Sequence, residues 1–156
     1  MHRGQTIPRQ WLIADAGLGH DVLAAVRNLP RGSGVFVLFH QMAARDRHRL
    51  VRRLRRLAAG RSLVIVDEQP RSAARVHNLP ELRRALLRRT PLILLSPIYT
   101  TRSHPDWRPL RRMQAAALAR LAGRRLIALG GMNERRFAQI RALGFQAWAG
   151  ISAFRT

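Results

Sequence analysis

Two glycine-containing segments in the last third of the sequence have the residue types of a phosphate-binding site. Gly130 and Gly131 follow a short apolar run and precede a predicted helix, and Gly150, Ile151 and Ser152 lie at the end of the next apolar run. Glycine lets backbone N–H groups approach an anion closely, and the N-terminus of a helix adds a favourable dipole. The pattern predicts phosphate binding, although the same glycines could only permit tight turns.

A hydroxyl-rich loop and two histidines are the other candidates for chemistry. The loop covers residues 96–105 after a strongly apolar run, and it includes Thr101, Ser103 and His104. A long loop in such a position is usually functional when it is ordered; the alternative is a polar surface loop. His77 follows a weaker predicted strand. Because histidine titrates near neutral pH, His77 or His104 could act as a catalytic base, or each could be an ordinary polar residue.

The elements that would position these residues alternate along the chain. We expect strands over 11–14, 35–39, 62–66, 73–77, 91–95, 126–129 and 147–153, and helices over 20–28, 43–59, 80–89, 110–122 and 134–143. Strands that are apolar throughout indicate a parallel sheet covered by helices. The sequence therefore predicts one α/β domain over residues 1–156, with its ligands beyond the carboxyl ends of the strands.

Composition restricts the possible chemistry and partners. The 156 residues carry 29 basic and 8 acidic side chains, a formal net charge of +21 at pH 7, and all 29 basic residues are arginine. Such a charge suits a polyanion, but arginine without any lysine indicates a coding bias, so we expect no specific nucleic-acid partner. The absence of lysine and cysteine excludes lysine Schiff bases, thiolate nucleophiles and disulfides.

Neither the apolar runs nor the N-terminal residues indicate a membrane or an export route. No run reaches the roughly 18–20 apolar residues of a membrane span. Residues 1–10 lack the apolar segment of a signal peptide. We therefore expect a cytoplasmic protein with no membrane contact.

The loop and the glycine segments together resemble the thiamine phosphate synthase/TenI family. Residues 96–99, followed by Thr101, Ser103 and His104, resemble its G-P-[IV]-[FY]-x-T-x-[TS]-[KH] loop. Residues 126–133 resemble its A-[IL]-G-G-[IM] segment, and residues 144–153 resemble its closing A-G-A-x-G-x-A-V-I-S-A-I segment. The resemblance implies a TIM-barrel-like fold that joins hydroxymethylpyrimidine diphosphate to thiazole phosphate with Mg²⁺ and releases diphosphate.

The resemblance also implies a role for individual residues. Thr101 and Ser103 match hydroxyl-bearing positions of the family loop, Asp67 matches a magnesium-binding aspartate, and His77 matches the histidine of an S-x-H strand. Four residues match the family's cradle for the thiazole phosphate: Gly130, Gly131, Ile151 and Ser152. Gly150 directly precedes Ile151 and is included with them.

The departures from the family pattern fall on the metal side of the site. A full barrel takes roughly 200 residues or more; if His77 belongs to the family's fifth strand, the resemblance implies that one unit of the eight is missing between Asp67 and Arg75. That unit would carry the second magnesium ligand, and Val66 replaces the asparagine beside the metal-binding aspartate. The residues that match the thiazole-phosphate cradle are therefore expected to be better preserved than those that would bind Mg²⁺ and the diphosphate.

Three functions compete on these observations. The first is a shortened, active thiamine phosphate synthase. The second is a diverged or TenI-like protein that binds a phosphorylated thiazole-type small molecule without the transfer. The third, a basic nucleic-acid-binding module, is disfavoured by the low aromatic content of 6% and by the lack of a recognisable binding motif. A seven-stranded barrel would also expose strand edges, and a second copy could cover them, so we expect a homodimer.

Overall fold

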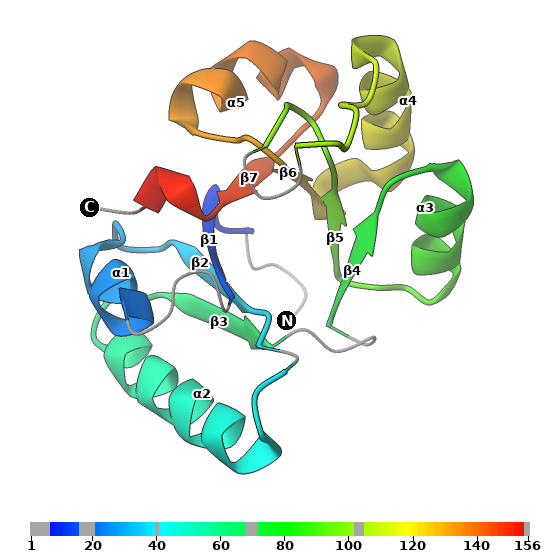
Figure 1. Cartoon of the computed structure of the whole chain (residues 1–156). Helices are drawn as coiled ribbons and strands as arrows, with labels where there is room; N and C mark the ends of the chain where they lie inside the picture. Colours follow the sequence, from blue (N-terminus) through cyan, green and yellow to red (C-terminus); the bar gives the residue numbers. More distant parts are fainter. Residues whose placement is uncertain (1–6, 16–20, 40, 68–71, 102–104, 155–156) are drawn as a thin grey trace.

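The computed structural model describes residues 7–15, 21–39, 41–67, 72–101 and 105–154, apart from the side chain of Ser152 (Figure 1). Strands and helices alternate through most of the chain. In order they are β1 Gln10–Ala14, α1 Val22–Asn28, β2 Gly34–Val37, α2 Ala44–Ala59, β3 Val64–Asp67, β4 Ala73–Val76, α3 Leu79–Leu87, β5 Leu92–Leu95, α4 Arg112–Ala122, η2 Gly123–Arg125, β6 Leu126–Leu129, α5 Glu134–Ile140, η3 Arg141–Leu143, β7 Ala147–Gly150 and η4 Ser152–Phe154. No helix among these residues is long and apolar enough to cross a membrane.

All seven strands belong to one parallel sheet, as the continuous apolar runs predict. The strand order is β3-β2-β1-β7-β6-β5-β4, and β1 pairs with both β2 and β7 in parallel register. The sheet curls, and the helices lie outside it (Figure 1). The expectation of a TIM-barrel-like fold that lacks one unit is confirmed.

The position of the missing unit is visible in the sheet order. β3 and β4 follow each other in sequence with only residues 68–72 between them, yet they form the two ends of the sheet. In a complete eight-stranded barrel one further strand would join these two edges. The unit expected to be absent between Asp67 and Arg75 therefore falls at the opening between β3 and β4.

The outer face of the sheet carries two hydrophobic clusters because the helices are amphipathic. α1 and α2 pack over the first half of the sheet, where Val26 and Leu54 are fully buried. Helices α3, α4 and α5 pack over β4 to β7 around Leu82 and Phe137. Both faces of the strands are therefore covered, and each strand needs apolar side chains at successive positions.

The inner face is filled by side chains, so the sheet encloses a packed core. The rings of Trp11 and Phe36 are completely buried, with their centroids 4.6 Å apart. Gly34 lies opposite Trp11 in the register, and a Cβ atom there would lie only 2.1 Å from the indole ring. A small residue on β2 thus makes room for the large one on β1, as interior packing at native density requires.

Most elements are one to three residues shorter than the sequence predicts, and the backbone shows the reason for three of them. The last strand ends at Gly150 instead of residue 153, since the chain turns into η4. The helix expected over 134–143 ends at Ile140 and continues as η3 before Gly144, which has a φ of +102°. The helix expected from residue 110 begins at Arg112, because Arg111 has an extended backbone.

Candidate functional site

The candidate residues follow the carboxyl ends of different strands of the sheet. Asp67 is the last residue of β3, His77 follows β4 directly, Gly130 follows β6 and Ile151 follows β7. The half-buried Thr101 lies in the loop after β5. In a parallel sheet these ends share one edge, where ligands of this fold class bind. Ser103, His104 and the side chain of Ser152 lie outside the described residues.

Gly130 and Gly131 are required by the packing of the loop that follows β5. Their φ angles are +93° and +62°, a region that glycine adopts without strain. A Cβ atom on Gly130 would lie 2.9 Å from Cα of Pro97, and one on Gly131 would lie 2.4 Å from the carbonyl oxygen of Thr100. The glycines therefore have a structural role, whether or not they also bind a phosphate.

Backbone hydrogen bonds fix the same loop on the glycine segment. The Ile98 N–H donates to the Leu129 carbonyl at 2.9 Å, and the Tyr99 N–H donates to the Gly130 carbonyl at 3.0 Å. The loop and the end of β6 therefore form one ordered unit.

The two glycine segments lie next to each other. A Cβ atom on Gly150 would lie 3.2 Å from the Met132 carbonyl oxygen, so the end of β7 lies close to the chain after β6. Ile151 packs against the inner cluster of the sheet. The structure thus brings together the two segments that the sequence singles out for phosphate binding.

Arg136 adds a cation at this place that the sequence analysis does not single out. Its guanidinium donates to the Gly131 carbonyl and lies 4.9 Å from the centroid of the Tyr99 ring. The backbone of Arg136 is fixed in turn, since its N–H donates to the Asn133 side chain at 2.9 Å and so completes the cap of α5. An arginine three residues after a capping asparagine is the sequence signal that could have found it.

His77 is held by a carboxylate from the first turn of α3. Its Nδ1 atom lies 3.0 Å from Oε2 of Glu81, and its backbone N–H donates to the same oxygen at 2.7 Å. The Trp107 ring lies edge-on to the imidazole, with 5.2 Å between the centroids. This arrangement fixes the orientation of the imidazole, which proton transfer to a bound ligand would require.

The same contacts set the ionisation of Glu81. Burial by itself raises the pKa of this carboxyl, but hydrogen bonds from the His77 backbone, the His77 ring and the Asn78 side chain outweigh that effect, and the pKa of Glu81 lies below its ordinary value. The carboxylate also belongs to the α3 cap, because its Oε1 accepts from the Asn78 side-chain amide at 3.0 Å, while the Glu81 N–H donates to Oδ1 of Asn78 at 3.0 Å. Glu81 is therefore a charged acceptor for its neighbours near neutral pH.

Asp67 has an arginine as its partner. The guanidinium of Arg47, from α2, forms an ion pair with the Asp67 carboxylate, and both side chains are about three-quarters buried. Among the described residues, no three His, Asp or Glu side chains gather into a group that could hold a metal ion. A magnesium site normally uses one or two carboxylates that face the ion and the substrate phosphates. The described residues at the end of β3 therefore do not fit the magnesium site that the resemblance implies.

The seven-stranded curled parallel sheet, with its helices outside and its candidate residues at the carboxyl ends, defines an α/β protein of the TIM-barrel type. The family model described as thiamine monophosphate synthase (TMP-TENI) matches residues 73–154, which is more than half of the chain. The chain belongs to this family.

Solved structures agree with this assignment at the level of the fold. A thiamine phosphate pyrophosphorylase from Pyrococcus furiosus has a TM-score of 0.73 and 15% identity, over 93% of this chain and 86% of that one. A thiamine phosphate pyrophosphorylase from Bacteroides thetaiotaomicron has a TM-score of 0.58 and 14% identity, over 94% and 84% of the two chains. The comparison with curated protein sequences gives no match.

Proposed function

We propose that this protein binds a phosphorylated thiazole-type small molecule at the carboxyl ends of β6 and β7. The observation that carries the proposal is the close approach of the two glycine segments, with Met132 and Gly150 at their contact. Phosphate sites in barrels of this type lie beside the last two strands. Backbone N–H groups of residues 130–132 and 150–152 would bind the phosphate oxygens, with Thr101 and Ser103 as further hydroxyl donors.

We propose further that the protein does not carry out the magnesium-dependent transfer of the pyrimidine group. A diphosphate leaving group needs a metal ion or a clamp of cations to stabilise its developing charge. The family's aspartate is present as Asp67, but Arg47 already neutralises it, and the opening between β3 and β4 falls where the unit with the second ligand would stand. Binding without this transfer is therefore favoured over an active synthase.

A proton transfer on the bound thiazole is a second candidate function. The Glu81 carboxylate beside the His77 imidazole favours it, because an oriented imidazole can take a proton from one ligand atom and return it to another. His104 is the alternative base.

Substitution of Ser152 tests the phosphate site without disturbing the glycines. Ser152→Asp adds a negative charge to one of the residues whose N–H groups are proposed to bind the phosphate, and we expect at least tenfold weaker binding of thiazole phosphate in calorimetric titration. Ser152→Asn is the matched control, since it has nearly the same shape without the charge, and its affinity should stay within threefold of the original. Equal affinities for the two variants would refute the proposed position of the phosphate.

A second copy of the chain is proposed to cover the open edges of β3 and β4. Unpaired strand edges tend to recruit another strand or a covering element, and among the described residues the sheet has two such edges. Light scattering should give twice the 17.7 kDa of the single chain. A monomeric mass would exclude this part of the proposal.

A further inference from the structure

We propose that the outer face of α2 binds the phosphate backbone of nucleic acids without regard to base sequence. The face consists of six exposed arginines, which are called the arginine face below: Arg45, Arg49, Arg52, Arg53, Arg55 and Arg56. This inference is independent of the small-molecule site, which lies at the carboxyl ends of the strands.

The arginines of α2 are concentrated beyond what the composition of the chain explains. Seven of the twelve residues 45–56 are arginine, whereas arginine supplies 29 of all 156 residues. A coding bias towards arginine raises its frequency along the whole sequence and does not by itself gather it on one helix. The opposite side of α2 is apolar, and Val51, Leu54 and Ala58 are buried against the sheet. Six of these seven arginines, all except Arg47, are therefore on the sides of the helix that face solvent.

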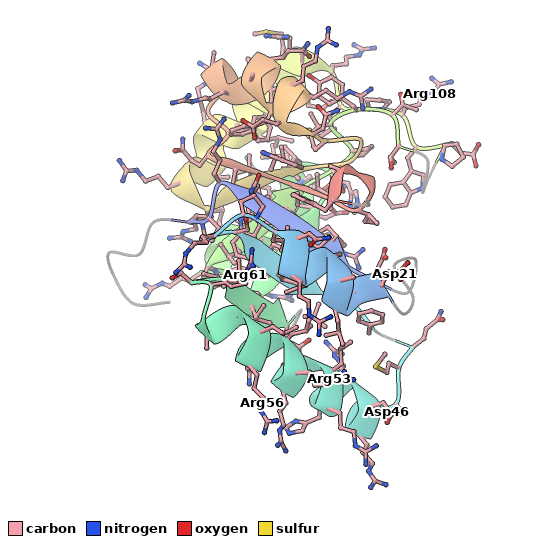
Figure 2. The ribbon with its side chains drawn as sticks, turned by 90° about the vertical axis from the view of Figure 1, so that its left-hand side faces the viewer. Asp21, Asp46, Arg53, Arg56, Arg61 and Arg108 are labelled. Atoms are coloured by element: carbon pink, nitrogen blue, oxygen red, sulfur yellow. The ribbon has the colours of Figure 1, made fainter. Side chains whose placement is uncertain are left out.

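The arginine face has little internal neutralisation. Asp46 is the only acidic residue of α2. Its Oδ1 atom lies 3.9 Å from a guanidinium nitrogen of Arg49, and both side chains are more than 60% exposed. An exposed pair of that length contributes little. The ion pairs recorded between described residues include no carboxylate partner for Arg52, Arg53, Arg55 or Arg56. Figure 2 shows Arg53 and Arg56 on solvent-facing sides of α2, with Asp46 near its N-terminal end.

The spacing of the arginines suits a regular polyanion. Arg45, Arg49, Arg52 and Arg56 recur at intervals of four, three and four residues, which places them in one row along a helix. The eleven steps from Arg45 to Arg56 rise by about 17 Å at about 1.5 Å per residue. One strand of a duplex carries about one phosphate per 3.4 Å of its axis, so this row spans about five phosphates of a strand.

The chemistry of the face favours a nucleic acid over an anionic membrane. A helix that lies in a membrane surface inserts exposed apolar side chains between the lipids. The apolar side of α2 is already packed on the sheet, and the exposed large hydrophobic side chains recorded in the structure lie on other segments: Leu87, Trp107, Met113 and Leu121. Guanidinium groups, in contrast, bind phosphate oxygens through paired N–H donors.

Two quadruple variants of equal charge test the proposal. The first replaces Arg52, Arg53, Arg55 and Arg56 by glutamine. The second replaces four exposed arginines by glutamine, which lie in α3, directly after α3, in α4 and in η2: Arg83, Arg88, Arg120 and Arg124. Each lowers the net charge by four, from +21 to +17, and glutamine keeps nearly the helix propensity of arginine. Circular dichroism should confirm that both variants retain the helical content of the original protein.

The measurement is the affinity for a labelled 20-base-pair DNA duplex of arbitrary sequence, followed by fluorescence anisotropy between 50 and 200 mM NaCl. Each phosphate contact contributes about 0.9 to the slope of log K against log salt. We expect the α2 variant to lose about 3 to 4 from this slope and at least 30-fold in affinity at 100 mM NaCl. The control variant should lose less than one from the slope and stay within threefold in affinity.

Two other results would overturn the proposal. Equal losses in the two variants would mean that the net charge of the whole molecule, and no particular face, attracts the duplex. Co-sedimentation of the original protein with phosphatidylserine vesicles, under salt conditions in which it does not bind the duplex, would assign the arginine face to a membrane instead.

Discussion

At the scale of single residues, packing accounts for the two glycines after β6. A side chain on Gly131 would meet the Thr100 carbonyl at 2.4 Å in a backbone region that L-residues rarely adopt. Gly60, which follows α2, has a φ of −74° and open space around its Cα hydrogens. The same chemical change should therefore have opposite consequences at these two positions.

We expect Gly131→Ala to lower the free energy of unfolding by about 3 kcal/mol, from backbone strain and a clash with the loop. Gly60→Ala should leave it unchanged or raise it by about 0.5 kcal/mol, because alanine restricts the unfolded chain. Urea denaturation measures both values. A loss below about 1 kcal/mol for Gly131→Ala would contradict the packing described for this loop.

The pair of Asp67 and Arg47 gives a second prediction at this scale. Asp67→Asn and Arg47→Gln should each lower the free energy of unfolding by about 1–2 kcal/mol, since each leaves a mostly buried charge without its partner. The double variant should lose less than the sum of the two single losses, with a coupling of about 1 kcal/mol. Strictly additive losses would show that the two side chains do not interact.

At the scale of elements, the start of α3 combines a helix cap with a candidate catalytic histidine. Asn78 and Glu81 cap the first turn together: Oδ1 of Asn78 accepts from the Glu81 N–H, and Oε1 of Glu81 accepts from the Asn78 side-chain amide. A polar cap residue followed three positions later by an acidic residue is a common start of a helix. The Glu81 carboxylate then extends the cap to His77. The orientation of the imidazole therefore depends on the formation of the helix.

The acid stability of the protein should depend on Glu81. The pKa of Glu81 is lowered in the folded protein, so its ionised form contributes stability above the ordinary glutamate pKa, and this contribution is lost as the pH falls through the lowered folded value. In urea titrations between pH 6 and pH 3, Glu81→Gln should lose less stability than the original protein. Asp106→Asn, in the exposed loop after β5, is the control and should follow the original curve. A Glu81→Gln curve parallel to the original would contradict this role.

Most elements could be predicted from the sequence, because apolar runs and amphipathic segments record which faces become buried. The cap of α3 was also predictable, since Asn78 and the proline after Leu79 are local signals. The partners of Asp67 and His77 were not. Arg47 is one of 29 arginines with similar surroundings in the sequence, and only the fold shows which of them meets the carboxylate.

At the scale of the whole molecule, the two halves of the chain match the family to different extents. The part matched by the family model begins at β4 and ends in η4, and it contains the loop after β5, both glycine segments and His77. The departures gather in the first half, where β3 ends in a neutralised aspartate and leads almost directly to β4. Because β3 and β4 are the two ends of the sheet, the missing unit leaves no strand between them, while the pairing of β1 with β7 still joins the two halves of the sheet.

The measurement that tests the central claim most directly is calorimetric titration with thiazole phosphate, and then with hydroxymethylpyrimidine diphosphate in the presence and absence of Mg²⁺. The account predicts that the monophosphate binds with one molecule per chain, that Mg²⁺ does not strengthen binding of the diphosphate, and that a mixture of the two yields no thiamine phosphate. Magnesium-dependent binding of the diphosphate followed by formation of thiamine phosphate would contradict the account.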